Sequence, residues 1–559
     1  MKIALAQFNP IVGDIRGNLT RMSEFIARAR SGGADIIVFG ELSVVGYPPR
    51  DLLKKDGFVA DSVAGVEELA KCCQGITALV GFVRPNPDPA GRPLQNAAAV
   101  LAQGRVENVH VKTLLPTYDV FDETRYFEPG LKPGCIEING RRIGLSICED
   151  LWDADALGRE LYGQDPIAML AEDGAELIIN MSASPYEQGK AKTREALFTR
   201  QASRSGLPIL YVNQVGGNDE LVFDGTSCAI SPTGEIIARA KGFCEDLLEV
   251  DLAAGPQRIE ELDGEMPRLS AALKLGLRDY VTKCGFSSVV LGSSGGIDSA
   301  VVAALAADAV GPENVYSLAM PSRYSSDHSL SDAELLAKNL KIHYKVVPIE
   351  PMHAACEGAF DGLLDGGNLD IAGENIQARI RGSLVMAVSN AFGHLPLATG
   401  NKSELSTGYC TLYGDMCGGL APIGDVLKTV VYDLAEQLNA EVGFDRIPRG
   451  IITKAPSAEL KPDQFDDDKL PPYPLLDEVI SRYIEGDETA RQIIDAGFDG
   501  AYLDIIDAYE YFADRGRASA EREMVEFVRA IGEYARSHNP GFLIVPQNAP
   551  ELAAHPEYL

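Results

Sequence analysis

Positive charge is scarce in this sequence. Its 559 residues contain 50 Lys and Arg against 81 Asp and Glu, which gives a formal net charge of -31 at pH 7. Self-repulsion and repulsion by phosphate groups would together oppose a non-specific grip on nucleic acid or on an anionic membrane. The composition therefore excludes nucleic acid and membrane as partners, and any bound phosphate must be held by a local site.

Long apolar runs and paired cysteines are also missing. No stretch of about 18 apolar residues occurs, and the apolar core within residues 1–10 is too short for a signal peptide. The 10 cysteines include no Cys-x-x-Cys pair, so we interpret most of them as reduced core residues. We therefore expect a cytoplasmic protein.

The chain is long enough for at least two domains, because single hydrophobic cores stop growing well below its length. Strand-like apolar runs alternate with helical or turn-rich stretches over residues 1–252, which predicts a layered α/β domain. Residues 253–267 are rich in Gly, Pro and acidic residues and are predicted to form a linker. Residues 268–499 open with a predicted helix at 269–281 and continue as an α/β domain.

The strand and helix alternation of the second domain predicts a doubly wound parallel sheet, with its ligand at the carboxyl ends of the strands. The strands predicted in the two domains include residues 36–39, 143–147, 177–179, 209–212, 315–319, 344–349 and 395–399.

Residues 287–299 carry the most informative motif. A short strand, Ser-Ser-Val-Val-Leu-Gly, precedes a Ser-Ser-Gly-Gly-Ile-Asp-Ser turn that opens an Ala- and Val-rich helix. Gly295 and Gly296 permit positive φ and let backbone N–H groups approach an anion, while the helix points the positive end of its dipole at the charge. The residues predicted to form this phosphate-binding turn are Ser294, Gly295, Gly296, Ile297, Asp298 and Ser299.

This turn differs from two common phosphate loops. It lacks the Lys of the Gly-x-x-x-x-Gly-Lys-Ser/Thr loop and the spacing of Gly-x-Gly-x-x-Gly. A phosphate would repel Asp298 unless a divalent cation lay between them, so the turn predicts binding of a Mg-nucleotide. It resembles the pyrophosphatase loop of enzymes that cleave ATP between the α- and β-phosphates to form an adenylate.

Three reactive side chains follow strands in the first domain: Glu41, Lys112 and Cys148. A cysteine nucleophile needs a base to form its thiolate, and the oxyanion produced by its attack on a carboxamide needs a cation or N–H donors. Glu41 is predicted to be the base, Cys148 the nucleophile and Lys112 the oxyanion-stabilising cation.

The order and local sequences of these residues resemble the Glu-Lys-Cys set of the nitrilase-like amidases. The resemblance implies an α-β-β-α layered fold and a second glutamate, Glu123, that helps to place the substrate. It also implies glutamine contacts at Tyr118, Ser184 and Lys190. Lys190 stands where an arginine is often found in that family.

An ammonia-releasing amidase joined to an adenylating, ATP-pyrophosphatase-type domain resembles the glutamine-dependent NAD synthetase family. The resemblance extends to about residue 499 and includes four further segments, at 320–326, 374–381, 398–404 and 454–460. It implies a homo-oligomer that amidates deamido-NAD to NAD with ATP and with ammonia from L-glutamine. An NAD-adenylate is the implied intermediate, and AMP, pyrophosphate and glutamate are released.

The same resemblance implies roles for residues of the second domain. It places Asn375, Arg379 and Glu404 at deamido-NAD, Thr399, Lys428 and Ser457 at ATP, and Asp298 and Glu404 at Mg²⁺. These residue types suit the roles, because Lys and Arg offset phosphate charge while paired carboxylates bind a hard cation through oxygen.

The last 60 residues, 500–559, depart from this family. Where the synthetases end in a Lys- and Arg-rich strip, the chain has Asp504, Asp507, Glu510 and Asp514, then an amphipathic helix near 521–535 and a further apolar run. The segment resembles a fragment of a (β/α)₈ glycoside hydrolase family, but it is too short to close a barrel, which needs about 200 residues or more. We interpret it as a fusion or assembly artefact.

Two other functions stay open at this point. Without the basic strip, the chain could be a free glutaminase or ω-amidase that carries an inactive nucleotide-binding domain. It could also be a non-catalytic assembly subunit, since nitrilase-like domains commonly oligomerise.

Overall fold

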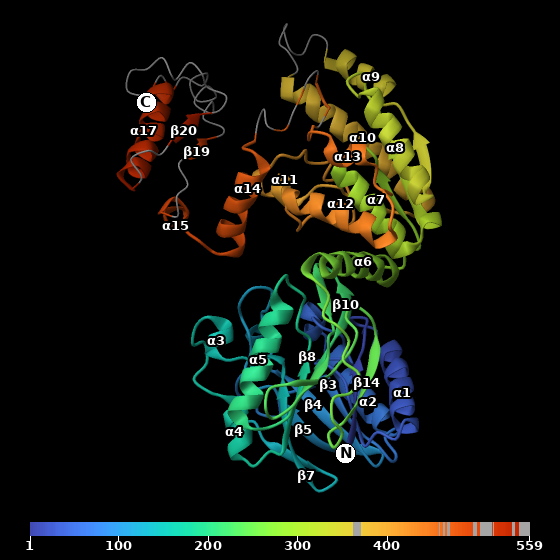
Figure 1. Cartoon of the computed structure of the whole chain (residues 1–559), viewed down its shortest axis with the longest axis vertical. Coiled ribbons are helices and arrows are strands. Elements are labelled where there is room, and N and C mark those ends of the chain that lie inside the picture. The colour runs from blue at the N-terminus through green and yellow to red at the C-terminus, as the bar shows by residue number, and fades with distance from the viewer. Residues whose placement is uncertain are drawn as a thin grey trace. The chain divides into compact units, whose positions relative to one another are not determined.

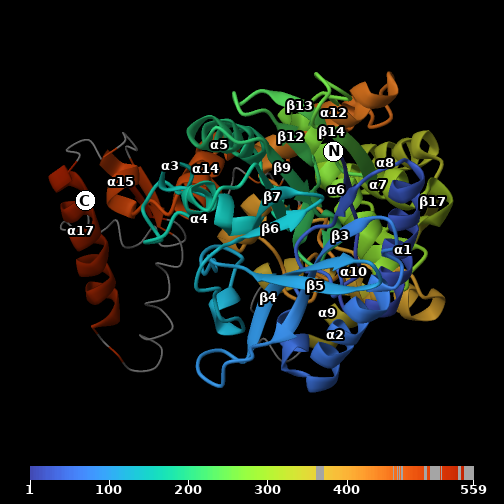
Figure 2. The same cartoon turned by 90° about the horizontal axis from the view of Figure 1, so that it is seen from below.

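The computed structural model describes residues 1–360, 370–457, 459–461, 464, 466, 470–495, 500–503, 517, 519–538 and 543–546. They form two compact units, seen from two directions in Figures 1 and 2. The first unit contains Met1–Ser287 with Asp308–Val310, and the second contains Ser288–Ala307 and the chain from Gly311 onward.

Two six-stranded sheets form the framework of the first unit. The first sheet has the order β14 (Asp246–Asp251), β1 (Lys2–Gln7), β2 (Ile36–Val38), β3 (Thr77–Pro85), β4 (Leu94–Ala102) and β5 (Arg105–Val111). The second sheet has the order β13 (Ile236–Arg239), β12 (Cys228–Ile230), β9 (Ile209–Asn213), β8 (Leu177–Ser182), β7 (Arg141–Ile147) and β6 (Cys135–Ile138).

The two sheets pack face to face, because successive side chains of a strand point to opposite faces. Ile3 and Leu5 of β1 share a buried cluster with Leu145 of β7 and Ile179 of β8. Alternate residues of the first sheet, such as Ala4, belong instead to the cluster that includes its covering helices. Those helices are α1 (Ile15–Ser31) and α2 (Asp56–Ala70), while α4 (Pro166–Glu172) and α5 (Lys190–Ser205) pack on the second sheet. The predicted α-β-β-α order of layers is confirmed.

Helix α6 (Glu265–Lys283) packs on a hairpin of the first unit, formed by β10 (Val215–Asn218) and β11 (Leu221–Asp224). The backbones meet closely, since a Cβ on Gly217 would lie 2.9 Å from the Cα of Gly276. The helix predicted at 269–281 is confirmed. It begins at Glu265, inside the segment predicted to be a linker.

A buried carboxylate joins this hairpin to two helices. Asp224, at the end of β11, is fully buried and accepts from the guanidinium groups of Arg194 on α5 and Arg268 on α6. The Arg268 Nη2 to Asp224 Oδ2 distance is 2.5 Å. Because both arginines are also buried, Asp224 supplies the counter-charge that their burial requires.

The second unit contains a four-stranded sheet with the order β17 (His343–Val346), β16 (Val315–Ala319), β15 (Val289–Gly292) and β18 (Leu395–Leu397). All neighbouring strands are parallel. The chain moves outward from β15 through β16 to β17 and then returns to the other side of β15. The turn after β15 therefore lies where the strand order reverses, which is where open α/β sheets bind ligands.

Both faces of this parallel sheet are covered. Val290 and Leu318 pack with Ile380 and Val385 of α10 (Asp370–Phe392). Val289 and Leu291 point to the opposite face and are also fully buried. The doubly wound arrangement expected from the sequence is confirmed, and α7 (Ile297–Val310), which follows the turn, is buried on most of its surface, as expected for a helix that is apolar all round.

The described part of the C-terminal segment forms a strand-helix-strand unit. β19 (Gly500–Leu503) and β20 (Leu543–Pro546) pair in parallel, and α17 (Ala520–His538) lies between them in sequence. The amphipathic helix expected near 521–535 is confirmed. Asp504, Asp507, Glu510 and Asp514 lie outside the described residues, and the origin of residues 500–559 stays a prediction.

Among the described residues, no helix is both long and apolar enough to cross a membrane.

Replacement of Asp224 by Asn should destabilise the first unit, because two buried guanidinium groups would then face a neutral amide. Breaking a buried ion pair costs about 3–5 kcal/mol, so the free energy of unfolding in urea should fall by about that amount. Glu220→Gln, which removes the exposed partner of Arg50, is the matched control and should cost under about 1 kcal/mol. Similar losses in the two variants would contradict the structural role of Asp224.

Candidate active sites

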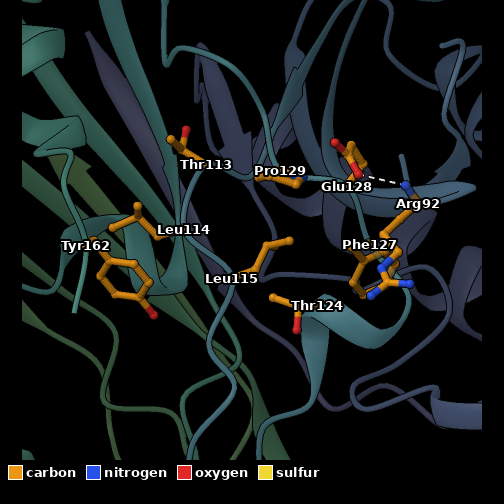
Figure 3. Close-up of a pocket in the computed structure, with 9 residues that line it drawn as sticks. All are labelled: Arg92, Thr113, Leu114, Leu115, Thr124, Phe127, Glu128, Pro129 and Tyr162. Carbon is orange, nitrogen blue, oxygen red and sulfur yellow. Dashed lines mark hydrogen bonds between the residues drawn. The ribbon is translucent and has the colours of Figure 1, made fainter. Parts of the chain in front are cut away.

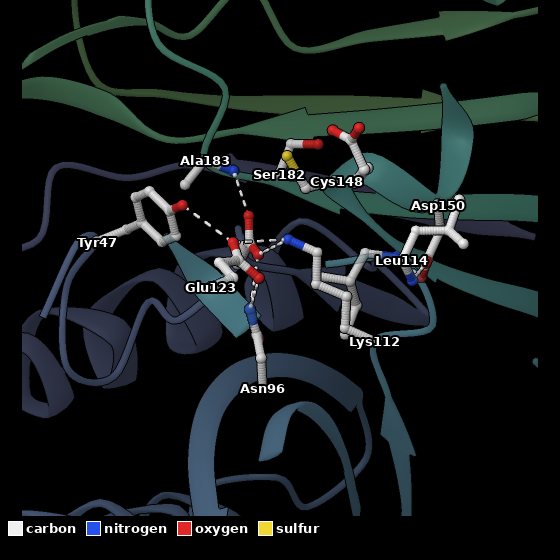
Figure 4. A network of polar contacts seen from close by, with 12 residues as sticks. Tyr47, Asn96, Lys112, Leu114, Glu123, Cys148, Asp150, Ser182 and Ala183 are labelled. Atoms are coloured by element: carbon white, nitrogen blue, oxygen red, sulfur yellow. Dashed lines mark hydrogen bonds and ion pairs between the residues drawn. The ribbon is translucent and has the colours of Figure 1, made fainter. Parts of the chain in front are cut away.

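Three strand ends and one short turn carry the acidic, basic and thiol groups of the first unit. Glu41 follows β2, Lys112 follows β5 and Cys148 follows β7, while Glu123 begins the 3₁₀ helix η2 (Glu123–Arg125). All four side chains are buried. Figure 4 shows Lys112, Glu123 and Cys148 around one centre, and Glu41 joins them through its ion pair with Lys112. The structure thus brings together the four residues predicted to be catalytic.

Lys112 lies between the two carboxylates. Its Nζ atom is 2.6 Å from Glu41 Oε1 and 2.8 Å from Glu123 Oε1, and the Lys112 side chain is fully buried. Burial opposes the ammonium charge, but Glu123 and Glu41 outweigh it and hold the pKa of Lys112 well above its usual value. Lys112 is therefore a permanent cation in the centre of the cluster.

Neutral groups fix the two carboxylates. Asn96 Nδ2 donates to Glu41 Oε1 at 2.7 Å, and the backbone N–H of Ala183 donates to Glu41 Oε2 at 3.2 Å. Tyr47 donates its hydroxyl to Glu123 Oε1 at 3.0 Å. Glu41 thus keeps one orientation toward the cluster, as a positioned general base requires.

Burial and the neighbouring charges shift the acid-base properties of the cluster. Burial raises the pKa of the Cys148 thiol well above its usual value, and Glu41 raises it further while Lys112 lowers it. Burial also raises the pKa of Glu123 to about 7, against the opposing effect of Lys112. Cys148 is therefore a thiol at rest and needs a base when it reacts.

Cys148 occupies a strained turn. It opens the 3₁₀ helix η3 (Cys148–Leu151) with a φ of 45°, a left-handed conformation that few non-glycine residues adopt. Such outliers cluster at active sites, where the surrounding structure holds them in place.

The residue after the nucleophile has its own partners. Glu149 is buried, and its carboxylate accepts from the hydroxyls of Tyr118 at 2.8 Å and Tyr162 at 2.9 Å. Burial raises the pKa of Glu149. A buried carboxylate held by neutral donors is suited to a cationic group of a ligand.

Ser184 and Lys190 lie on the segment that follows β8. Ser184 is buried, and its backbone is clamped by Asn213, whose Oδ1 accepts from the Ser184 N–H at 2.8 Å. Ser184 follows Ala183 directly, so it lies beside Glu41. Lys190 is the first residue of α5 and pairs with Glu187 at 3.5 Å.

A pocket of about 330 Å³ lies beside the cluster (Figure 3). Thr113 and Leu114, which follow Lys112, form part of its wall together with Tyr162, the donor to Glu149. The other lining residues are Arg92, Leu115, Thr124, Phe127, Glu128 and Pro129.

The second site begins at the turn between β15 and α7. Gly295 has a φ of +77°, and a Cβ there would lie 2.3 Å from the backbone oxygen of Ser329, so only glycine fits. Gly296 is extended, with a φ of -93°, and precedes the helix. Of the two glycines, only Gly295 therefore has a positive φ. The hydroxyls of Ser294 and Ser299 lie 3.2 Å apart, which closes the predicted phosphate loop into a compact turn.

Asp298, on the first turn of α7, meets two other predicted residues. Lys428 Nζ lies 2.5 Å from Asp298 Oδ2 and 3.4 Å from Glu404 Oε1. Burial raises the pKa of Glu404 to about 8, and the charge of Asp298 raises it further. The two carboxylates predicted to bind a metal therefore share one cationic group.

The remaining predicted residues of the second unit lie at its loops and on α10. Thr399 lies two residues after β18, and Ser457 donates its hydroxyl to the Gln464 carbonyl at 2.5 Å. Asn375 and Arg379, one helical turn apart on α10, contact a neighbouring loop: Asn375 Oδ1 accepts from the Thr411 hydroxyl and Arg379 Nε donates to the Leu412 carbonyl. Their ligand roles stay predictions.

Sequence reasoning missed several residues that hold these sites. Asn401 donates to Asp298 Oδ1 at 2.8 Å and caps the helix that carries Glu404. Its position three residues before Glu404 is a sequence signal that could have identified it. The charge of Glu149 beside the nucleophile was another. Asn96 offers no such signal, because it reaches Glu41 only through the pairing of β3 with β2 and with β4.

The fold and the two clusters define a class: a nitrilase-like amidase unit joined to a nucleotide-binding ligase unit. The family model for carbon-nitrogen hydrolase matches residues 2–257, and the model for NAD synthase matches residues 269–509.

Several relatives match along nearly the whole chain. The glutamine-dependent NAD(+) synthetase of Synechocystis sp. is 46% identical over 508 residues, covering 89% of this chain and 91% of that protein. The enzyme of the same name from Aquifex aeolicus is 42% identical, covering 90% of this chain and 93% of that protein. The solved structure of glutamine-dependent NAD+ synthetase from Acinetobacter baumannii with ADP is 37% identical, has a TM-score of 0.76 and covers 94% of each chain. The chain belongs to the glutamine-dependent NAD(+) synthetase family.

The raised pKa of Glu123 predicts how the reactivity of Cys148 depends on pH. As the pH falls through about 7, Glu123 gains a proton, and a negative charge that raises the pKa of the Cys148 thiol is removed. The rate at which iodoacetamide alkylates the Cys148 thiolate should therefore fall by less than about tenfold per pH unit around pH 7, because the lowered thiol pKa partly offsets the loss of thiolate. The alkylated peptide that contains Cys148 can be measured by mass spectrometry.

Glu123→Gln should remove this titration and raise the alkylation rate on the alkaline side, because the charge that opposes the thiolate is then absent at every pH. Glu107→Gln, a change to an exposed residue paired with Arg105, is the control and should keep the wild-type profile. A titration near pH 7 that persists in Glu123→Gln would assign it to another group.

Proposed function

We propose that this chain makes NAD from deamido-NAD and ATP with ammonia that it releases from glutamine. The observation that carries the proposal is the pair of clusters: a thiol beside Glu41 and Lys112 in one unit, and a phosphate-type loop with Asp298, Lys428 and Glu404 in the other. The names of the relatives and the NAD synthase model support the choice of substrates.

In the amidase unit, Glu41 takes the proton of Cys148 as the sulfur attacks the side-chain amide carbon of glutamine. The oxyanion that forms is stabilised by Lys112 and by the backbone N–H of Glu149. Glu41 then gives the proton to the leaving ammonia. Water, activated by Glu41, hydrolyses the thioester and releases glutamate.

The polar groups beside Cys148 suit the two ends of glutamine. The Glu149 carboxylate, oriented by Tyr118 and Tyr162, attracts the α-ammonium group. Lys190 and the hydroxyl of Ser184 hold the α-carboxylate. Glu123 fixes Lys112 and helps to place the amide.

In the ligase unit, the nicotinate carboxylate of deamido-NAD attacks the α-phosphate of ATP, and pyrophosphate leaves into the loop at 294–299. Ammonia then displaces AMP from the adenylate to give NAD. Asn375 and Arg379 bind deamido-NAD. The ATP contacts are Thr399, Lys428 and Ser457. The relative from Acinetobacter baumannii was solved with ADP, which supports a nucleotide site in this chain.

The residues present fit a magnesium ion. Asp298 and Glu404 offer two carboxylates that already share a cationic partner, Lys428, and Mg²⁺ is typically held by one or two carboxylates together with substrate phosphates and water. When bound, the ion neutralises phosphate charge. We place the enzyme in the cytoplasm as a homo-oligomer.

Replacement of Cys148 by Ala tests whether the two chemistries are separate. The variant should lose glutamine-dependent NAD formation and keep ammonia-dependent NAD formation nearly unchanged, because the thiol serves only the release of ammonia. Both rates can be measured by the NAD formed. Equal loss of both rates in the variant would contradict two separate sites. If the wild-type chain releases glutamate but forms no AMP with ammonia, it is a free glutaminase.

Replacement of either proposed metal ligand should weaken the response to magnesium. Asp298→Asn and Glu404→Gln should each raise the Mg²⁺ concentration for half-maximal AMP formation by about tenfold or more, the scale on which changes around a metal reduce its affinity. Asp425→Asn, at an exposed carboxylate paired with Lys402, is the control, and glutamine hydrolysis reports on folding. An unchanged magnesium response in both variants would show that the metal binds at other residues.

A further inference from the structure

We propose that Asp150 is a positioning residue of the amidase site, which holds the ends of β5 and β7 so that Lys112 and Cys148 address the same carbonyl group. The inference rests on the proposed hydrolysis of glutamine for its reaction, and on the described hydrogen bonds for its geometry.

Asp150 bridges the two segments through backbone groups alone. Its Oδ2 accepts from the N–H of Ile147 at 2.9 Å, and its Oδ1 accepts from the N–H groups of Thr113 at 3.0 Å and Leu114 at 2.7 Å. Ile147 precedes Cys148, and Thr113 follows Lys112. One carboxylate therefore binds the residue before the nucleophile and the two residues after the oxyanion-stabilising cation, and Figure 4 shows Asp150 beside Leu114.

Strand pairing does not fix the ends of β5 and β7 relative to each other. β5 is the edge strand of one sheet, while β7 belongs to the other. The sheets contact each other through apolar side chains, which fill the space between them but carry little directional information. The distance between the ends of β5 and β7 therefore needs a directional contact, and Asp150 provides two, from the N–H groups of Thr113 and Leu114.

Burial of the Asp150 carboxylate costs free energy. Asp150 is 1% exposed, and burial raises its pKa to about 7 although three N–H groups oppose the shift. A buried carboxylate bonded to neutral donors is a poor source of stability. An asparagine could not form the same hydrogen bonds, because an ionised carboxylate accepts on both oxygens while an amide has a donor on one side.

Asp150 also fixes the wall of the pocket beside the site. Thr113 and Leu114, whose N–H groups it accepts, both line that pocket. Movement of this segment would change the place of Lys112 and the shape of the pocket together.

The test compares Asp150→Asn with Asp279→Asn. Asp279 is also buried in the first unit and accepts a backbone N–H, that of Gly217, at 2.9 Å, but it lies on α6. Two measurements are made on each folded variant: the kcat and KM of glutamine hydrolysis, and the rate of Cys148 alkylation by iodoacetamide followed on its peptide. Ammonia-dependent NAD formation by the same sample serves as an internal measure of intact protein.

Asp150→Asn should lower kcat by about 10²-fold, the scale of a misplacement of about 1 Å at a reacting centre, with a smaller change in KM, and should slow Cys148 alkylation. Asp279→Asn should leave both rates per folded molecule unchanged, although it lowers the melting temperature. If Asp150→Asn is insoluble, Asp150→Glu, whose longer arm misplaces the carboxylate, is held to the same criteria.

Equal effects of the Asp150 and Asp279 changes on kcat and alkylation would overturn the proposal, because Asp150 would then be an ordinary structural acceptor. An unchanged kcat in Asp150→Asn would overturn it as well. If the wild-type protein does not hydrolyse glutamine but alkylation of Cys148 still slows in Asp150→Asn alone, the proposed function fails while the positioning role stands.

Discussion

A fully buried ammonium group must have its charge balanced inside the protein, and Lys112 has two carboxylates for this purpose. Glu41 arrives from the end of β2 and Glu123 from a turn, while Lys112 extends from β5. Three separate segments of the chain therefore meet at one point, where two carboxylates balance the charge of Lys112. The proposed chemistry uses this same arrangement, since balancing the charge of Lys112 also fixes the positions of the proposed base, Glu41, and of Glu123.

The second unit also contains a buried lysine between two carboxylates, but these carboxylates are more exposed than those of the first unit. Lys428 is 2% exposed and lies between Asp298 and Glu404, whose side chains are 17% and 18% exposed. The carboxylates of the amidase cluster are nearly closed to solvent, while those of the ligase cluster can be reached from outside. A closed cluster suits a reaction carried by its own side chains, and an open one suits a site that must admit a large charged substrate.

Much of the fold and of the two sites followed from sequence, because apolar runs define buried strands and reactive residues lie where those strands end. The prediction for 143–147 coincides with the end of β7. The strand expected at 344–349 ends at Val346 instead, and Ile349 is buried against α10, because burial alone does not distinguish a strand from the loop after it. Asn96 could not be found, since its contact with Glu41 depends on tertiary pairing that local sequence does not encode.

The three residues that follow β7 illustrate how one short turn can serve three purposes. A 3₁₀ helix has about three residues per turn, so consecutive side chains leave it about a third of a turn apart. Within η3, Cys148 therefore points toward Lys112, Glu149 toward its tyrosines, and Asp150 toward the backbone of the neighbouring loop. An inserted or deleted residue would rotate each side chain into the direction of another. The length of this turn is thus as strictly constrained as the identity of any residue in it.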